Sequence, residues 1–313
     1  MRPRSSVGIA LVVLVAALGS ANLSLALSTD SDTISGAVTT DTLLAPTGLG
    51  ATGGLSVSLS WTATTKTWAT GYHVYRATTA GGPYSLVGTV TPRTTVTFAD
   101  GPASGTWYYT VRAYFQSWES ADAGPVSAMV QAQTGYKPCV AASNAADASG
   151  AGDNNGYETN PIRVCTDDSS FATDSNSGTG GTQSCGAAAV PDATKDRHRF
   201  WGYALGLPAS VTSIDGIQLR ADLALNNVTG TTALCAQLSW DGGTTWTSLK
   251  TQAIASAAET TYTFGGTADT WGRAWTTTQL NTTNLRVRIV DASTLTTKQF
   301  QLDYLAVQVT YTP

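Results

Sequence analysis

Charged side chains are scarce in this chain of 313 residues, where they make up 12% of the sequence, about half the usual share. Only two histidines are present, His73 and His198, although histidine is the commonest proton shuttle in enzymes. The net charge of −4 also lacks the basic excess that nucleic-acid binding needs. These deficits argue against a nucleic-acid-binding protein and weigh against an acid–base enzyme.

Lysine and glutamate are rare as well, with five and three copies. Helical bundles and coiled coils depend on these residues at helical spacing, so neither is expected. The chain instead has 51 threonines, 31 glycines, 12 tyrosines and 9 tryptophans. Branched and aromatic side chains fit a pleated sheet, and the length suits about two domains. We therefore expect an all-β fold with an apolar core.

The N-terminus has the pattern of an export signal. Arg2 and Arg4 precede an apolar run over residues 7–18, and small residues follow it. This pattern predicts a signal helix in residues 1–26, cleaved after Ala21 or Ala26, with an uncleaved anchor as the alternative. A polar linker over residues 27–44 follows. We expect a secreted or cell-surface protein that meets a membrane only through an uncleaved N-terminal segment.

Residues 45–134 contain short alternating segments separated by turns. Residues 55–61, 72–76, 94–98 and 107–113 predict strands, and Trp61 and Trp107 fall on their apolar positions. The segments Ala45–Leu49, Tyr72–Arg76 and Gly105–Ala113 resemble the fibronectin type III family. The resemblance implies an immunoglobulin-like sandwich in which Trp61 is the buried core tryptophan. In bacterial surface proteins such modules often act as spacers.

Residues 135–313 continue the β pattern, with expected strands at 217–225, 234–240, 246–250, 285–290 and 300–311. About eight strands fit a larger jelly-roll-like sandwich better than a seven-stranded immunoglobulin-type domain. Segments such as Asp196–Phe200, Ile214–Arg220 and Leu285–Arg288 resemble an uncharacterised bacterial extracellular jelly-roll module. That resemblance implies a fold and an extracellular location rather than a defined activity.

One hairpin motif stands out in this second region. The pattern S-x-D-x-G-x-T-W is similar to the Asp-box of sialidase propellers, and its residues are Ser239, Asp241, Gly243, Thr245 and Trp246. A propeller needs repeated copies, and this sequence has one. We therefore expect a stiff structural hairpin without a catalytic role.

All four cysteines also lie in the second region, and an even number in an exported chain implies disulfides with three possible pairings. The spacing has no C-x-x-C pair and so does not suggest zinc. The resembling modules imply the pair Cys185–Cys235, which leaves Cys139–Cys165.

Acidic and amide side chains gather in polar loops of the second region. Asp153, Asn155 and Glu158 offer oxygen ligands of the type that calcium prefers. Jelly-roll carbohydrate-binding modules imply a partner Asp on the last strand, which would be Asp303. The expected cofactor is a structural calcium ion at these four residues, and the alternative is a solvated turn.

The sequence offers no catalytic constellation that we could identify. No G-x-S-x-G elbow is present, and His198 lies between two arginines in a charged strand entry. Sugar binding is a better prospect than hydrolysis, because aromatic faces stack on sugar rings. The candidate ligand-binding residues are Trp201, Tyr203, Trp271 and Trp275, with burial in the core as the alternative.

Together these features predict an exported, non-enzymatic surface or matrix protein with an adhesive or structural role. In this hypothesis a fibronectin III spacer presents a jelly-roll binding module to a glycan, a cell-wall polymer or another surface protein. One alternative is a carbohydrate-binding accessory protein of polysaccharide degradation, and a second is a secreted glycan-active hydrolase.

Overall fold

The computed structural model describes residues 41–140, 144–147, 156–176, 184–187, 190–191 and 195–313. Strands dominate these residues, and the helix among them is the short 3-10 helix η1 (Pro161–Val164). The predicted signal helix at 1–26 lies outside the described residues. Within the described part, no helix has the length and apolar character that membrane crossing requires.

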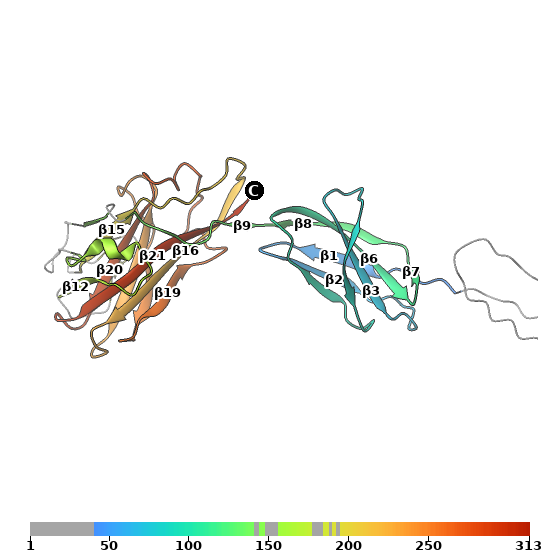
Figure 1. The fold of residues 1–313 in the computed structure, drawn as a ribbon, viewed down its shortest axis with the longest axis horizontal. Helices are drawn as coiled ribbons and strands as arrows, with labels where there is room; N and C mark the ends of the chain where they lie inside the picture. Colours follow the sequence, from blue (N-terminus) through green and yellow to red (C-terminus); the bar gives the residue numbers. More distant parts are fainter. Residues whose placement is uncertain (1–40, 141–143, 148–155, 177–183, 188–189, 192–194) are drawn as a thin grey trace, which may run out of the picture. The chain divides into compact units, whose positions relative to one another are not determined.

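The first eight strands form one β-sandwich (Figure 1). One sheet has the order β1-β2-β5, and the other has the order β4-β3-β6-β7 with β8 also paired to β6. This arrangement is a fibronectin type III-like β fold, as the sequence predicted. The strands are β1 (Thr47–Thr52), β2 (Val57–Thr62), β3 (Gly71–Ala77), β4 (Ser85–Val90), β5 (Thr97–Asp100), β6 (Gly105–Phe115), β7 (Trp118–Glu119) and β8 (Ala123–Val130).

Alternation in the sequence builds the core of the first sandwich. Val57, Leu59 and Trp61 on β2 are buried while the residues between them are exposed. Trp61 packs edge-on against Tyr72 of β3, with ring centroids 5.2 Å apart. Trp107, at the start of β6, uses its indole N–H to donate a hydrogen bond to the Ala103 carbonyl at 2.8 Å.

The remaining strands form a second β-sandwich with two main sheets (Figure 1). The "β16 sheet" has the order β10-β21-β16-β19, and β9 and β12 also pair with β21. Its strands are β9 (Ala132–Gln133), β10 (Lys137–Pro138), β12 (Ala172–Ser175), β16 (Ser213–Leu225), β19 (Thr260–Gly265) and β21 (Gln299–Thr312).

The "β20 sheet" has the order β11-β15-β20-β17-β18. Its strands are β11 (Asn144–Ala146), β15 (Arg197–Trp201), β17 (Thr232–Ser239), β18 (Lys250–Ile254) and β20 (Arg286–Ser293), and a separate two-stranded piece joins β13 (Gly186–Ala187) to β14 (Val190–Pro191). Buried side chains such as Leu219 and Leu223 of β16 and Val287 and Ile289 of β20 belong to one apolar core.

The long last strand departs from the simple alternation that the sequence suggested. On β21, Leu302 pairs with Leu223 of β16, whereas Tyr304 pairs with Asp222, so Asp303 is the extra residue of a bulge. The bulge shifts the register and interrupts the alternation of buried and partly exposed positions along the strand.

Two strand predictions were displaced along the chain. The segment expected at 94–98 is β5 at Thr97–Asp100, and the one expected at 246–250 is β18, which starts only at Lys250. Residues 240–246 form a turn, held by the hydrogen bonds of Ser239 and Asp241. Because these side chains satisfy the backbone locally, the chain resumes pairing later than the apolar pattern suggested.

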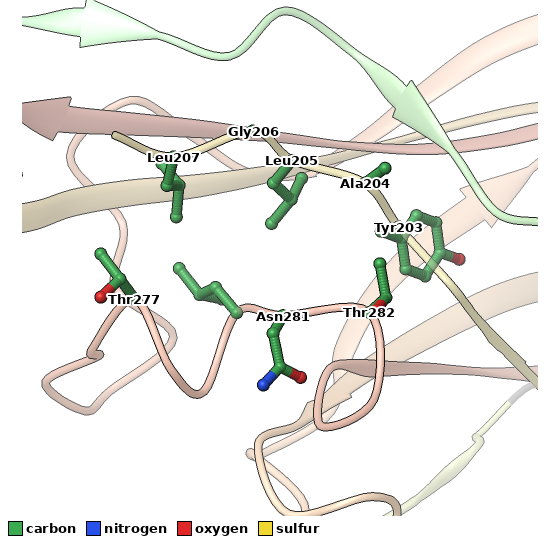
Figure 2. Close-up of a pocket in the computed structure, with 9 residues that line it drawn as sticks. Tyr203, Ala204, Leu205, Gly206, Leu207, Thr277, Asn281 and Thr282 are labelled. Atoms are coloured by element: carbon green, nitrogen blue, oxygen red, sulfur yellow. The ribbon is translucent and has the colours of Figure 1, made fainter. Parts of the chain in front are cut away.

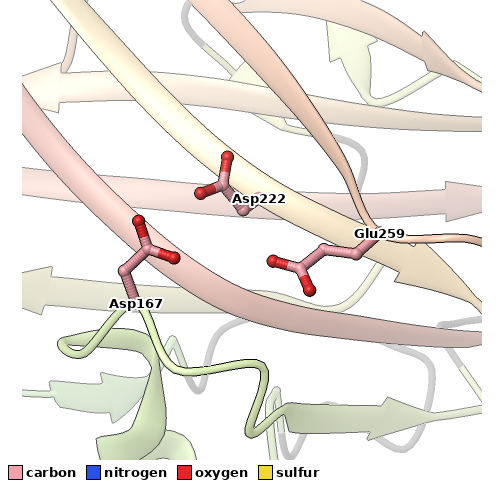
Figure 3. Close-up of side chains that lie close together, drawn as sticks. All are labelled: Asp167, Asp222 and Glu259. Carbon is pink, nitrogen blue, oxygen red and sulfur yellow. The ribbon is translucent and has the colours of Figure 1, made fainter.

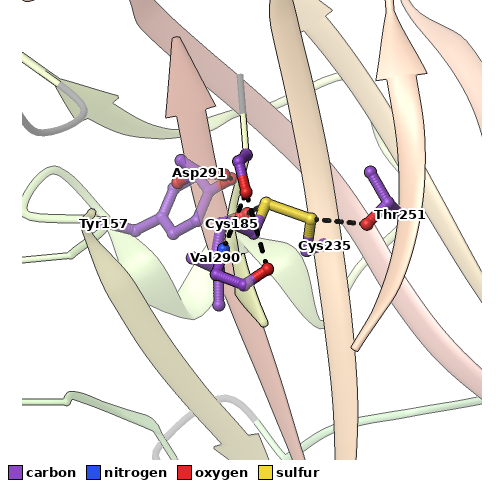
Figure 4. Close-up of a disulfide and its surroundings, with 8 residues drawn as sticks. Tyr157, Cys185, Cys235, Thr251, Val290 and Asp291 are labelled. Atoms are coloured by element: carbon purple, nitrogen blue, oxygen red, sulfur yellow. Dashed lines mark hydrogen bonds between the residues drawn. A yellow bond between two sulfur atoms is a disulfide. The ribbon is translucent and has the colours of Figure 1, made fainter. Parts of the chain in front are cut away.

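Two disulfides lie in the second sandwich, Cys139–Cys165 and Cys185–Cys235, the pairs that the resemblance implied. Cys185–Cys235 belongs to a small apolar cluster with Val290 and Ala292 of β20. Its sulfur atoms lie near the Val290 carbonyl and the Thr251 hydroxyl, as Figure 4 shows.

Candidate functional site

Four arginines project from one face of the β20 sheet. Arg197 and Arg199 alternate on β15, and Arg286 and Arg288 alternate on β20. Arg199 lies directly opposite Arg288 in the antiparallel ladder. Because alternate residues and direct cross-strand partners share a face, all four side chains lie on the face opposite Phe200 and Val287 of the core.

Two tryptophans stack on the arginines at this face. The guanidinium of Arg286 lies 4.5 Å from the ring centre of Trp201, and that of Arg288 lies 3.8 Å from the ring centre of Trp246. Stacking fixes the plane of a guanidinium but leaves the N–H groups at its edge available. We call this surface the arginine–tryptophan face: Arg197, Arg199, Trp201, Trp246, Arg286 and Arg288.

The turn after β17 positions Trp246. Asp241 Oδ1 accepts hydrogen bonds from the Ser239 hydroxyl at 2.9 Å and from the Thr244 and Thr245 N–H groups at 3.1 and 2.8 Å. The Trp246 indole N–H donates to the Gly243 carbonyl at 3.1 Å. These bonds fix the ring over Arg288, so the predicted hairpin residues support this face.

Arg288 of the arginine–tryptophan face has an acidic partner. Arg288 pairs with Asp147 at 2.6 Å and donates to Gln237 at 3.0 Å. Burial lowers the pKa of Arg288 to about 10, with Asp147 opposing the shift and the neighbouring Arg197 and Arg199 reinforcing it. Burial and Arg199 also lower the pKa of Arg286.

Two guanidinium N–H groups of this face are buried without an acceptor among the described residues. Arg199 Nε and Arg286 Nη1 have no hydrogen-bond partner among the described residues. The side chains themselves are only partly buried. Donors that are preorganised, positively charged and unsatisfied are suited to an anion with several oxygen atoms.

Three of the four aromatic residues proposed for sugar stacking are in the core. Tyr203, Trp271 and Trp275 are 0%, 5% and 6% exposed. The Trp271 and Trp275 indole N–H groups donate to the carbonyls of Ile217 and Thr270, both at 2.8 Å. Rings buried to this degree offer no face to a sugar, so among the four only Trp201 is placed for a ligand.

A shallow pocket of about 360 Å3 lies beside Tyr203 (Figure 2). It lies between residues 203–207 and the loop that carries Thr277, Leu280, Asn281 and Thr282, and no charged side chain lines it. Leu205 and Leu207 point toward this loop. The pocket thus offers apolar contact but no group for acid–base chemistry.

The residues predicted to bind calcium are divided between two places. Glu158 accepts hydrogen bonds from the Ser175 N–H and lies near Asp174, whereas Asp303 accepts one from the Ser170 N–H and lies beside Glu259. Asp153 and Asn155 lie outside the described residues. The structure therefore does not bring Glu158 and Asp303 into one cluster.

Near Asp303, three carboxylates converge on the β16 sheet: Asp167, Asp222 and Glu259 (Figure 3). Arg220 already lies among them, since it forms ion pairs with Asp222 and, at 3.0 Å, with Asp167. Thr261 adds a hydrogen bond to Asp222 at 2.6 Å. The guanidinium offsets part of the negative charge of the three carboxylates.

His198 is placed in the core and not in a catalytic cleft. It is 3% exposed, and its Nδ1 accepts the Tyr157 N–H at 3.1 Å. Burial, with a smaller contribution from Arg199, lowers the pKa of His198 to about 4. The ring is therefore neutral at physiological pH and is shielded from solvent.

Sequence reasoning overlooked the arginine–tryptophan face, although a signal for it was present. Both Arg197-x-Arg199 and Arg286-x-Arg288 place arginines two residues apart, which puts each pair on one face of a strand. What the sequence did not supply was the pairing of β15 with β20, which brings the two pairs together.

No family model and no curated protein matches the chain. Among solved structures, a Fn3-like protein from Clostridium thermocellum is 31% identical, with 28% of this chain and 94% of that one covered and a TM-score of 0.26. The CBM22-1–GH10 modules of the xylanase Xyn10B from the same organism, complexed with xylohexaose, are 14% identical at a TM-score of 0.29. That match covers 58% of this chain and only 28% of the xylanase chain. The FN1–FN3 domains of chicken CNTN1 are 11% identical at a TM-score of 0.28. That match covers 82% of this chain and 65% of the CNTN1 chain.

Proposed function

We propose that the protein is an exported, non-enzymatic surface or matrix protein whose second sandwich binds an anionic extracellular polymer. The observation that carries the proposal is the pair of partly exposed arginines Arg199 and Arg286 on adjacent strands, each with a buried donor that is unsatisfied among the described residues. The buried Arg197 and Arg288 lie on the same face, and Arg286 and Arg288 stack on Trp201 and Trp246. A polymer rich in carboxylate, sulfate or phosphate groups would supply the acceptors.

The chemistry of the guanidinium favours this class of ligand. Its planar fork of donors matches the paired oxygens of a carboxylate or a phosphate, and such charge-assisted bonds are stronger than neutral ones. The tryptophan rings add apolar surface that suits the hydrophobic faces of a sugar. An anionic polysaccharide combines both features, so it is the form of polymer that we propose.

The wider organisation proposed for the chain fits this role. A signal segment at 1–26 would export it, the sandwich at 45–134 would act as a spacer, and the jelly-roll-like module at 135–313 would bind. Two disulfides in the second sandwich suit an oxidising, extracellular compartment. Attachment to a polymer would then make the protein adhesive.

Binding of the full chain to three polyanions tests the proposal: polygalacturonate, dextran sulfate and a teichoic acid, with neutral dextran as the reference. We expect saturable binding to at least one polyanion that weakens as salt is added, because ions screen the attraction. Arg199→Gln and Arg286→Gln should each weaken binding about tenfold or more, since each removes charge-assisted hydrogen bonds.

The matched control is Arg163→Gln, which removes the same charge from an exposed position on η1. It should leave the affinity nearly unchanged. An equal loss in Arg163→Gln would show that net charge alone drives binding, which contradicts the proposal. Binding only to neutral glycans would favour a carbohydrate-binding accessory protein, and no binding to any polymer would favour a purely structural role.

A further inference from the structure

Two carboxyl groups meet between the sheets of the second sandwich, on the side of the β20 sheet away from the arginine–tryptophan face. Asp291 alternates with the core residue Ile289 along β20, so its side chain points toward the β16 sheet. Asp174 alternates with the core residue Ala172 along β12, so its side chain points toward the β20 sheet. The two acids therefore approach each other from opposite sheets.

Both carboxyl groups are removed from solvent and are in contact. Asp174 and Asp291 are 0% and 2% exposed, and their side chains lie within hydrogen-bonding reach of each other. Asp291 Oδ1 also accepts the Tyr157 hydroxyl at 3.1 Å, and Figure 4 shows these two residues side by side. Two ionised carboxylates repel each other strongly in a dry site, so this contact is favourable only with a proton between them.

The surroundings of Asp174 also favour a bound proton. Neither of its oxygens accepts a hydrogen bond from an N–H or hydroxyl group of the described residues. Burial is the largest cause that raises the pKa of Asp174, and the charge of Asp291 adds to the shift. Asp196 and Glu158 raise this pKa further, because both are acidic. Burial likewise raises the pKa of Asp291.

We propose that Asp174 and Asp291 share a proton and form a proton-dependent link between the two sheets, which holds at neutral pH and breaks at alkaline pH. With the proton in place, one carboxyl group donates a hydrogen bond to the other. Without it, two negative charges are left in contact in a buried site, and their repulsion separates the side chains. The edge strand β12 then loosens from the β20 sheet.

The direction of the pH effect follows from the number of bound protons. In the unfolded chain both acids are ionised above about pH 5, because the ordinary pKa of Asp is about 4. The folded chain keeps the shared proton, so unfolding releases it and a rising pH favours the unfolded state. Release of one proton raises the unfolding constant about tenfold for each pH unit, until the folded pair itself loses the proton.

The first experiment compares urea unfolding of the full wild-type chain and of Asp174→Asn from about pH 6 to about pH 9. The amide introduced at position 174 donates to the ionised Asp291 and needs no proton from solvent. The unfolding constant of the wild type should therefore rise, relative to that of the variant, about tenfold for each pH unit. His73 and His198 are present in both proteins, so their titration cancels in this ratio.

Infrared spectroscopy detects the shared proton directly, because the C=O stretch of a protonated carboxyl group differs from that of a carboxylate. The wild type should show this band at neutral pH. The band should weaken in Asp174→Asn and in Asp291→Asn, and the second variant keeps the test decisive if the first does not fold. The control Asp167→Asn removes an exposed carboxylate that pairs with Arg220, and it should keep both the band and the pH dependence.

Amide hydrogen exchange, corrected for the direct effect of pH on the exchange reaction, follows the loosening of β12. Exchange at Ala172–Ser175 should quicken at alkaline pH more than exchange in the central strand β16. Asp174→Asn should remove this difference, because its link does not depend on a bound proton.

Four results would overturn the proposal. The first is the same pH dependence of unfolding in the wild type, Asp174→Asn and Asp291→Asn. The second is a wild type without the band of a protonated carboxyl group. The third is exchange in β12 that quickens no more than exchange in β16. The fourth is stabilisation of the wild type by Ca2+ that is lost in Asp174→Asn, which would mean that the acids are ionised around a cation.

Discussion

Glu119 connects three strands on one face of the first sandwich. Its carboxylate accepts hydrogen bonds from His73 and Tyr75 of β3 and from Arg112 of β6, the last at 2.9 Å. Burial opposes ionisation, but these bonds outweigh it and lower the pKa of Glu119 to about 2. His73 also stacks on Tyr114, with ring centroids 4.1 Å apart.

Replacement of the Glu119 carboxylate should destabilise the protein by an amount that depends on pH. Because the folded-state pKa is about 2, below the usual value of 4.5, the stabilisation is complete above about pH 5 and is lost as pH falls toward 2. Glu119→Gln should therefore lower the free energy of unfolding by about 1 kcal/mol at neutral pH. Urea unfolding at several pH values measures the difference, which should shrink on acidification.

Asp122→Asn is the control for that series. Asp122 also pairs with Arg112, at 2.7 Å, but its side chain is 41% exposed. Asp122→Asn should therefore lower the free energy of unfolding by less than Glu119→Gln does. A cost for Glu119→Gln that stays constant down to pH 2 would contradict the proposed role of its charge.

At the scale of elements, the entry of residues 156–158 into the second sandwich depends on a glycine. Gly156 has a φ of 60°, and a Cβ there would lie 2.6 Å from His198 Nδ1 and 2.9 Å from the Arg197 carbonyl oxygen. This close approach lets the next residue, Tyr157, donate its N–H to His198 and its hydroxyl to Asp291.

We expect Gly156→Ala to destabilise the protein by several kcal/mol, because a clash with backbone adds to the strain of a positive φ. Gly206→Ala is the matched control, since Gly206 has a φ of 67° and nothing within 4 Å of the added Cβ. Gly206→Ala should lower the free energy of unfolding by only about 1 kcal/mol, because it adds backbone strain without a clash. Equal losses of stability in chemical denaturation would show that the contact with His198 is unimportant.

The pairing of elements also explains why the arginine–tryptophan face was harder to predict than the strands. Alternation marks β20 as a strand from local sequence alone, whereas β15 was not among the expected strands. Whether Arg199 faces Arg288 depends on register, and a shift by one residue would point one arginine pair into the core. Asp303 illustrates the same limit, because its bulge follows from pairing between β16 and β21.

For the whole molecule, both disulfides lie in the second sandwich. Cys139–Cys165 spans 26 residues and Cys185–Cys235 spans 50. A cross-link restricts the unfolded chain more when it closes a longer loop, so the expected contributions are about 3.5 and about 4 kcal/mol.

The double variants Cys139→Ser/Cys165→Ser and Cys185→Ser/Cys235→Ser should each lower the free energy of unfolding by about 2–5 kcal/mol. Loss of Cys185–Cys235 should lower the free energy of unfolding slightly more than loss of Cys139–Cys165. The reason is that Cys185–Cys235 closes the longer loop and its cysteines also pack in the cluster with Val290. Denaturant unfolding of each variant and of the wild type under non-reducing conditions, where the remaining bridges stay intact, measures both effects. Unchanged stability in either variant would contradict the contribution assigned to that bridge.

The sequence by itself determined the all-β class, the positions of most strands and the burial of Trp61 in a fibronectin III-like core. The class and the strand positions follow from alternation and composition, which are local, whereas the fibronectin III-like core around Trp61 was implied by the family resemblance. Tertiary structure alone decided that Tyr203, Trp271 and Trp275 are buried, that Glu158 and Asp303 lie in different clusters, and that four arginines converge. Those outcomes depend on which strands pair and in which register, and that choice is made by contacts between residues far apart in the chain.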